Sequence, residues 1–257
     1  MPVTADELIF TGCDQHAEDD VSQQGGAESM GKRISFDGGE MASSGTVYLE
    51  ADVAITGTWR VTGRSAGGIV TEDFVFSAEA GPKNGSQSFD YLTKVELVTG
   101  NLAAAATLGV YETTPDSILC YLYGNGVDPL GVEVTEVRRF FLNSIIPGGG
   151  STDRYEKMFV RNVDPSDAVS LGEGRETADA GGEFEFAIAT ALGDTESTTD
   201  RLTAPVAVGT FDSLDKSLPT NLVAGSAIAL WAKYTLSAGA SAGARHYNQQ
   251  VRGNAFA

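Results

Sequence analysis

The stretch Thr58–Phe76, TWRVTGRSAGGIVTEDFVF, predicts a β-hairpin. Trp59 and Val61 alternate with polar residues, and Phe74 and Phe76 are spaced in the same way after a glycine-rich turn. Because successive side chains of a strand point to opposite faces, this period of two gathers the large apolar side chains on one face. An apolar face needs a second layer to cover it, so the hairpin predicts half of a β-sandwich.

Comparable short runs recur along the chain roughly every 8–12 residues, the spacing expected of a sandwich or jelly roll. Residues 183–189 alternate glutamate and alanine with apolar side chains, and residues 227–234 form the last strong apolar run. The 31 glycines cluster between these runs, where turns are needed. We therefore predict an all-β protein with two β-sandwich or jelly-roll-like domains.

The domain boundaries follow from changes in composition. Residues 147–152, PGGGST, read as a flexible linker. The N-terminal region is polar, acidic and glycine-rich around residues 18–26, with too little apolar surface to fold alone, so it is either disordered or lies on a partner. Its one apolar patch, Leu8, Ile9 and Phe10, is the predicted partner-binding site. The predicted parts are an extended N-terminal arm, 1–45; a first β-sandwich domain, 46–146; the linker, 147–152; and a second β-sandwich domain, 153–257.

The net charge of −18 argues against a nucleic-acid partner, because such binders need a cationic face to displace counterions from phosphates. Two cysteines, Cys13 and Cys120, do not make a disulfide framework or a zinc spacing. We expect no membrane partner either, because no run approaches the roughly 18 apolar residues of a bilayer span. Without a signal-peptide pattern at its start, the protein is expected to be made in the cytoplasm and to remain there or to assemble there.

No stretch carries a clear catalytic pattern, so the prediction is a protein that is not an enzyme. Glu183 and Glu185 lie two apart on one strand face, roughly 7 Å from each other. That spacing would suit paired glycosidase carboxylates. Phe184 and Phe186, however, are expected on the core-facing side of the strand, so the two glutamates are expected to face solvent.

Metal binding, histidine-based catalysis and phosphate binding are also considered, and in each case a structural interpretation of the residues fits better. The acidic loops around Asp194–Asp200 and Asp164–Asp167 lack EF-hand spacing and are interpreted as polar loops without a metal. The two histidines, His16 and His246, lie near no G-x-S-x-G motif, and the glycines of the linker lack the lysine of a phosphate loop. We expect no cofactor. Trp59 and Trp231 are predicted to pack in the cores, with sugar stacking as the alternative.

Several segments resemble structural proteins from the morphogenesis clusters of tailed bacteriophages. The opening MPVTADEL of residues 1–8, with the acidic run at 18–20 and Gly25-Gly26-Ala27, is similar to the start of such proteins. The hairpin segment at 59–64 with Gly67-Gly68 resembles their VTVTGRDAAG hairpin. Further pieces of the second half resemble phage virion β-domains: 155–162 (YEKMFVRN), 203–205 (TAP), 222–225 (LVAG), 229–231 (ALW) and 238–240 (AGA).

The resemblance implies a virion component that coats, cements or connects. The expectation is a capsid decoration (cement) protein that binds the major capsid protein lattice and copies of itself, with trimers at local threefold axes. It would be assembled in the host cytoplasm and located on the capsid surface of the virion. The alternatives are a tail, neck or baseplate component and, from another class, a glycan-binding or glycan-hydrolysing tail protein. A glycan binder should show exposed aromatics and paired carboxylates in a cleft, and a cement protein should show a long arm and a flat contact face.

Overall fold

The computed structural model describes residues 8–16, 19–34, 41–66, 68–139, 150–179, 183–214, 216–218, 221–238 and 247–256. The protein is 62% β-strand, and the described residues contain no helix. This confirms the predicted all-β class. Accordingly, no described helix has the length and apolar character needed to cross a membrane.

The chain divides into two compact units. The central unit comprises the described residues of 30–139, and the terminal unit comprises those of 1–29 and 140–257. One strand, β2 (Gln24–Arg33), contributes residues to both units. Its last two residues pair in parallel with β8, which makes the strand pairing mixed.

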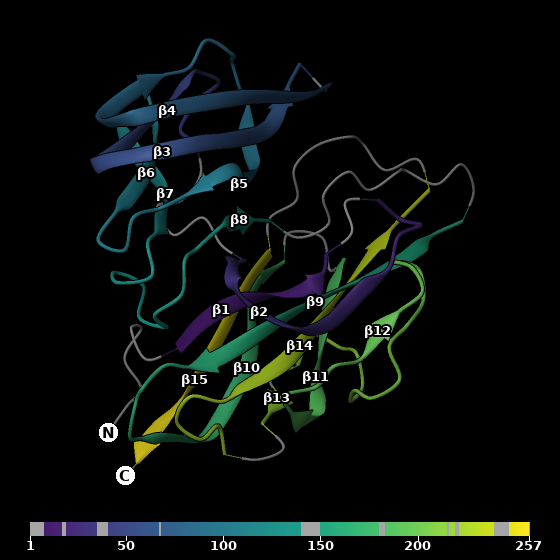
Figure 1. Ribbon diagram of the computed structural model, residues 1–257. Helices are drawn as coiled ribbons and strands as arrows, with labels where there is room; N and C mark the ends of the chain where they lie inside the picture. The colour runs from purple at the N-terminus through teal and green to yellow at the C-terminus, as the bar shows by residue number, and fades with distance from the viewer. Residues whose placement is uncertain are drawn as a thin grey trace. The chain divides into compact units, whose positions relative to one another are not determined.

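The central unit is organised around the long hairpin of β3 and β4, which pair antiparallel from Tyr48↔Asn84 to Ser65↔Gly68 (Figure 1). Along its other edge β3 pairs first with β6 and then with β5, so that one strand spans both parts of the sheet. The strand order is β8-β5-β3-β6-β7, with β4 on β3. The strands are β3 (Val47–Ser65), β4 (Gly68–Asn84), β5 (Tyr91–Asn101), β6 (Thr107–Glu112), β7 (Ser117–Tyr123) and β8 (Glu136–Arg138).

One core fills this unit, and the alternation of the hairpin accounts for it. Trp59 and Val61 on β3 and Phe74 and Phe76 on β4 are buried, while the residues between them face outward. The Trp59 and Phe76 rings are nearly perpendicular, at 86°, with 5.6 Å between ring centroids. Since Trp59 is fully buried, its predicted core role is confirmed.

The terminal unit holds two sheets. One has the order β11-β14-β9-β1-β2, with the short β12 on β2, and the other has the order β13-β10-β15. Phe184, Phe186 and Trp231 are buried in this unit. The alternation of residues 183–189 predicts the burial of the two phenylalanines, and the predicted core role of Trp231 is confirmed. The strands are β1 (Leu8–Gln15), β9 (Thr152–Asn162), β10 (Ala168–Asp179), β11 (Phe184–Leu192), β12 (Ser197–Thr198), β13 (Lys216–Ser217), β14 (Ala227–Leu236) and β15 (Tyr247–Phe256).

The N-terminal region differs most from the sequence-based expectation. The extended arm of 1–45 is not confirmed, because Leu8–Gln15 forms β1 between β9 and β2, and Gln24–Arg33 forms β2. The division into compact units falls near residues 29 and 139 and not at 147–152. Residues 147–149 of the expected linker lie outside the described residues. Pairing between strands more than a hundred residues apart leaves no periodic signal, so local composition did not predict these two strands.

Candidate functional site

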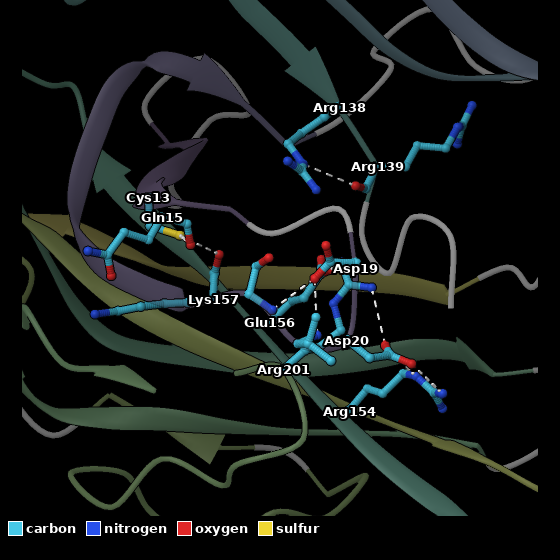
Figure 2. Close-up of polar contacts among 12 residues, drawn as sticks. Cys13, Gln15, Asp19, Asp20, Arg138, Arg139, Arg154, Glu156, Lys157 and Arg201 are labelled. Atoms are coloured by element: carbon cyan, nitrogen blue, oxygen red, sulfur yellow. Dashed lines mark hydrogen bonds and ion pairs between the residues drawn. The ribbon is translucent and has the colours of Figure 1, made fainter. Parts of the chain in front are cut away.

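The most charged part of the described interior lies in the terminal unit, where two arginines and two carboxylates neutralise one another (Figure 2). Arg154 of β9 binds Asp20 through two parallel hydrogen bonds, Nε to Oδ1 at 2.8 Å and Nη2 to Oδ2 at 2.7 Å. Arg201, from the loop after β12, lies 2.6 Å from Glu156 Oε1 and 3.6 Å from Asp20 Oδ1. The side chains of Arg201 and Glu156 are fully buried. We call these four residues the buried ion cluster.

The buried ion cluster fastens the segment before β2 to the middle of the sheet. Arg154 and Glu156 are two apart on β9, so they share one face of that strand. Paired, hydrogen-bonded charges are the form in which a protein interior tolerates ions. The cluster carries no net charge, so it presents no surplus charge to a substrate.

Lys157, which points to the other face of β9, makes a second buried anchor. Its Nζ donates to the backbone carbonyls of Gly26, Asp194 and Glu196 at 2.8–3.0 Å, and it lies 2.8 Å from the Asp194 carboxylate. The ammonium also lies 5.6 Å from the centre of the Trp231 ring, at cation–π distance. These contacts join β9, β2 and the loop after β11, so Lys157 acts as a structural tie.

A further ion pair crosses the N-terminal strand. Arg161 on β9 binds Glu28 on β2 through Nε and Nη2, at 2.7 and 2.5 Å. The Thr11 hydroxyl on β1, between these strands, donates to the same carboxylate at 2.7 Å. Strand β1 is therefore held by side chains as well as by its main chain.

The predicted partner-binding residues lie in this strand. Leu8, Ile9 and Phe10 are partly buried and pair with Asn162, Arg161 and Val160 of β9. Their main chains are already in a sheet, but no observation tests whether their side chains also contact a partner. Binding at these residues stays a prediction.

The acidic residues considered for catalysis or metal binding have structural partners. Glu185 accepts a hydrogen bond from Lys233 Nζ at 2.8 Å across the β11–β14 pair. Glu196 accepts from the backbone N–H of Ala207 at 2.9 Å, and Asp200 accepts from those of Leu202 and Thr203 at 2.9 and 2.8 Å. Among the described residues, no three His, Cys, Asp or Glu side chains are placed to hold a metal ion. His246 lies outside the described residues.

Asp164 provides a pH-dependent prediction. Its Oδ1 accepts backbone N–H groups of Asp167 at 2.7 Å and Ser166 at 2.8 Å, and these bonds hold the pKa of Asp164 below its usual range. A carboxyl whose pKa is lowered by folding stabilises the fold above the unfolded pKa, and this contribution disappears as pH falls through the folded pKa.

We therefore expect the carboxyl carbon of Asp164, followed by NMR, to titrate at lower pH in the native protein than in urea. Asp164→Ala should flatten the loss of stability that sets in as pH falls below about 3.9, the pKa of an unfolded aspartate. Equal midpoints in the native and urea-unfolded protein would contradict the turn's role.

A shallow cavity of about 290 Å³ lies beside β11, lined by residues that include Ile188, Thr190 and Lys216. The Lys216 ammonium already bonds the Thr210 carbonyl at 2.9 Å and the Asp212 carboxylate at 2.5 Å. These contacts also lower the pKa of Asp212. The charge of Lys216 is thus balanced by the neighbouring Asp212, and the described lining of the cavity holds no second titratable side chain.

The outer face of the central unit carries two features that the sequence reasoning missed. The first is a set of exposed apolar side chains: Ile69 and Val75, six residues apart on β4, are each 54% exposed, and Val98 on β5, on the far side of β3, is 42% exposed. We call these three residues the edge patch. A scan of the alternation pattern for apolar side chains on the polar face of the hairpin would have found it.

The second feature is a row of tyrosines across β3, β6 and β7. Tyr48 and Tyr111 are directly opposite each other in the β3–β6 register, and their rings stack with centroids 4.8 Å apart. Tyr121 and Tyr123 stack along β7 at 5.8 Å. Each of the four is partly exposed, and we call them the tyrosine face.

Two carboxylates, those of Asp116 and Glu50, act on the stacked pair of this row. The Tyr48 hydroxyl donates to Asp116 Oδ1 at 2.5 Å, and this bond, with burial and the charges of Asp116 and Glu50, raises the pKa of Tyr48 well above its usual range. Burial and then Tyr121, followed by Glu50 and Asp116, raise the pKa of Tyr111. The face therefore combines phenol hydroxyls with a negative potential.

Comparison with known proteins gives no identification, since no family model, no curated protein and no solved structure matches this chain.

Proposed function

We propose that this chain is a non-enzymatic structural component of a tailed-phage virion, which decorates the capsid by binding the major capsid protein lattice. The resemblance of the N-terminal and hairpin segments to phage structural proteins supports the class. The observation that carries the proposal is the open edge of β4 with the edge patch beside it. Among the described residues β4 pairs only with β3, so its second edge carries main-chain groups that a neighbouring subunit can pair with.

The side chains on and beside β4 favour a specific contact over pairing of this edge with any exposed strand. Glu79 and Lys83 form an exposed ion pair at 2.6 Å, and Arg60 of β3 holds Asp73 at 2.7 Å. Charged side chains on an edge strand disfavour pairing with arbitrary strands. Exposed apolar side chains within a polar surround are typical of protein–protein contact sites. The edge patch is therefore the surface we assign to the capsid lattice.

Location is tested with antibodies against the purified protein, used for immunogold labelling of particles from the source culture. Label on heads supports decoration, and label confined to tails or baseplates moves the protein to the tail, neck or baseplate class. Particles without label, in a lysate where the protein is present, would contradict a virion role.

The contact surface is tested by co-sedimentation with undecorated heads. The double variant Ile69→Asp/Val75→Asp should bind heads at least tenfold more weakly, because it places two charges in a desolvated contact. Val127→Asp is the control, since Val127 is also a half-exposed valine of the central unit, at 42%, and belongs to the segment after β7 and not to β4. Equal binding by both variants and the unmodified protein would remove the edge patch from the interface.

A further inference from the structure

The groups that the tyrosine face exposes to a ligand are mainly ring edges, hydroxyls and neighbouring carboxylates. Its ring faces are partly covered. Tyr48 and Tyr111 are nearly parallel, with 5° between their planes, so each covers one face of the other. The Tyr111 ring also lies over Gly109: a Cβ added at Gly109 would come within 2.5 Å of it. Glycine at this position lets the ring lie down on the sheet, which fixes its orientation.

Two carboxylates border the stacked pair, on residues that differ in exposure. Asp116 is exposed, lies in the turn before β7 with φ of +70°, and accepts the Tyr48 hydroxyl through one of its oxygens. Glu50 is partly exposed on β3, two residues from Tyr48 and therefore on the same face of that strand. Its charge acts on both stacked tyrosines.

This combination selects for a cationic ligand. A sugar ring binds by stacking on an open aromatic face, and the mutual stacking of Tyr48 and Tyr111 removes two of those faces. A guanidinium or ammonium group does not need an open ring face here, because the carboxylate and phenol oxygens accept its N–H donors. The net charge of −18 further favours approach of a basic segment.

We propose that the tyrosine face is a docking site for an arginine- or lysine-bearing segment of a partner protein. Tyrosines suit such a role because they supply large, rigid, amphipathic contact area at a low cost in side-chain entropy. That the partner is a capsid protein rests on the proposed function. That the ligand is cationic rests only on the residues of the tyrosine face.

The test uses the full-length protein and a synthetic peptide of alternating arginine and glycine, with a glutamine-for-arginine peptide as its neutral counterpart. Binding is followed by NMR of the tyrosine ring resonances and by calorimetry. We expect the arginine peptide, and not the neutral one, to shift the resonances of the tyrosine face. Maltohexaose is titrated in parallel as the probe for a glycan site.

Two variants with equal change of net charge separate specific docking from general attraction. Glu50→Gln/Asp116→Asn should weaken peptide binding roughly 3- to 30-fold, the range for two exposed charge contacts. Asparagine tolerates the positive φ of residue 116, so the turn should be retained. The control, Asp73→Asn/Glu79→Gln, neutralises two exposed carboxylates of β4 that pair with Arg60 and Lys83, and it should leave binding within about twofold.

The outcomes that overturn the proposal are distinct. Equal weakening by both variants would show that the acidity of the whole protein attracts the peptide. Shifts caused by maltohexaose and not by the arginine peptide would assign the face to glycans. Because this assay contains no virus particle, its failure is distinguishable from failure of immunogold labelling or head binding.

Discussion

Replacing Arg201 with methionine is expected to lower the free energy of unfolding of the terminal unit by about 3–5 kcal/mol, the usual cost of removing one partner from a buried pair. Arg201 and Glu156 both have fully buried side chains, with 2.6 Å between Nη2 and Oε1. Neither oxygen of Glu156 accepts a hydrogen bond of standard geometry from a described residue, so its charge is compensated by the ion pair with Arg201. Without Arg201 the Glu156 carboxylate would have to ionise unpaired in the interior or take up a proton.

The measurement is urea unfolding followed by tryptophan fluorescence. The sequence has two tryptophans, with Trp59 in the central unit and Trp231 in the terminal unit. Each therefore reports on one unit, and a Trp59→Phe background isolates the signal of Trp231. The transition reported by Trp231 should move to lower urea.

Two further variants give the prediction its controls. Arg60→Met breaks the ion pair between Arg60 and Asp73, whose side chains are 39% and 43% exposed, respectively. It should lower the free energy of unfolding by less than about 1 kcal/mol. Glu156→Leu with Arg201→Met removes both buried charges and should recover most of the loss, because apolar replacements of buried ion pairs are often neutral. A loss in the double variant as large as in Arg201→Met would show that packing of the arginine, and not its charge, stabilises the unit.

Local sequence patterns accounted for the features that depend on neighbouring residues. The hairpin of residues 58–76, the burial of Trp59 and Trp231 and the inward direction of Phe184 and Phe186 all follow from a period of two and from side-chain size. Such features are set by which face of a strand is covered. They do not depend on which distant strand provides the cover.

The features that were missed depend on distant partners. The polar composition of residues 18–26 suggested an arm, but Asp20 reaches Arg154, and Gly26 supplies a carbonyl to Lys157. One signal was present in the sequence: β9 places Arg154, Glu156 and Lys157 directly before its apolar run, residues 158–160. Charges in a strand that is buried on both faces require partners from elsewhere in the chain, although the sequence does not say which.

The tyrosine face escaped prediction for a different reason. Tyr48, Tyr111 and Tyr121 lie on three strands, and only the registers of β3 with β6 and of β6 with β7 bring them together. A one-residue change in either register would turn a tyrosine to the other face of the sheet. Cross-strand register, unlike periodicity, is a property of the folded chain.

Deleting residues 1–16 is expected to abolish the cooperative unfolding of the terminal unit. Strand β1 lies inside the sheet, paired with β9 from Leu8↔Asn162 to Thr11↔Phe159 and adjacent to β2 on its other side. Its removal would leave backbone groups of β9 without their sheet partners, each costing free energy where water cannot replace the bond. A disordered arm, in contrast, could be removed with almost no effect on stability.

Side-chain contacts add to the loss. Cys13 is fully buried in a cluster with Phe159, Ala189, Ala227 and Ala229, so its deletion exposes the apolar surface of three other strands. The Thr11 bond to Glu28 is lost as well. Losses of this kind are a large fraction of the roughly 5–15 kcal/mol that stabilise a typical domain. The expectation is therefore a partly structured terminal unit, recognised by early exposure of Trp231, with the transition of Trp59 preserved.

The matched control is deletion of residues 1–7, which leaves β1 whole and should retain the transition reported by Trp231. If the 1–16 deletion also retains it, the segment behaves as a detachable arm, and strand β1 does not stabilise the unit in solution. This result decides how binding to heads can be studied. A truncation that unfolds half of the protein would lose binding for reasons unrelated to contact, so substitutions on a folded surface, such as Ile69→Asp/Val75→Asp, are the informative probes of docking.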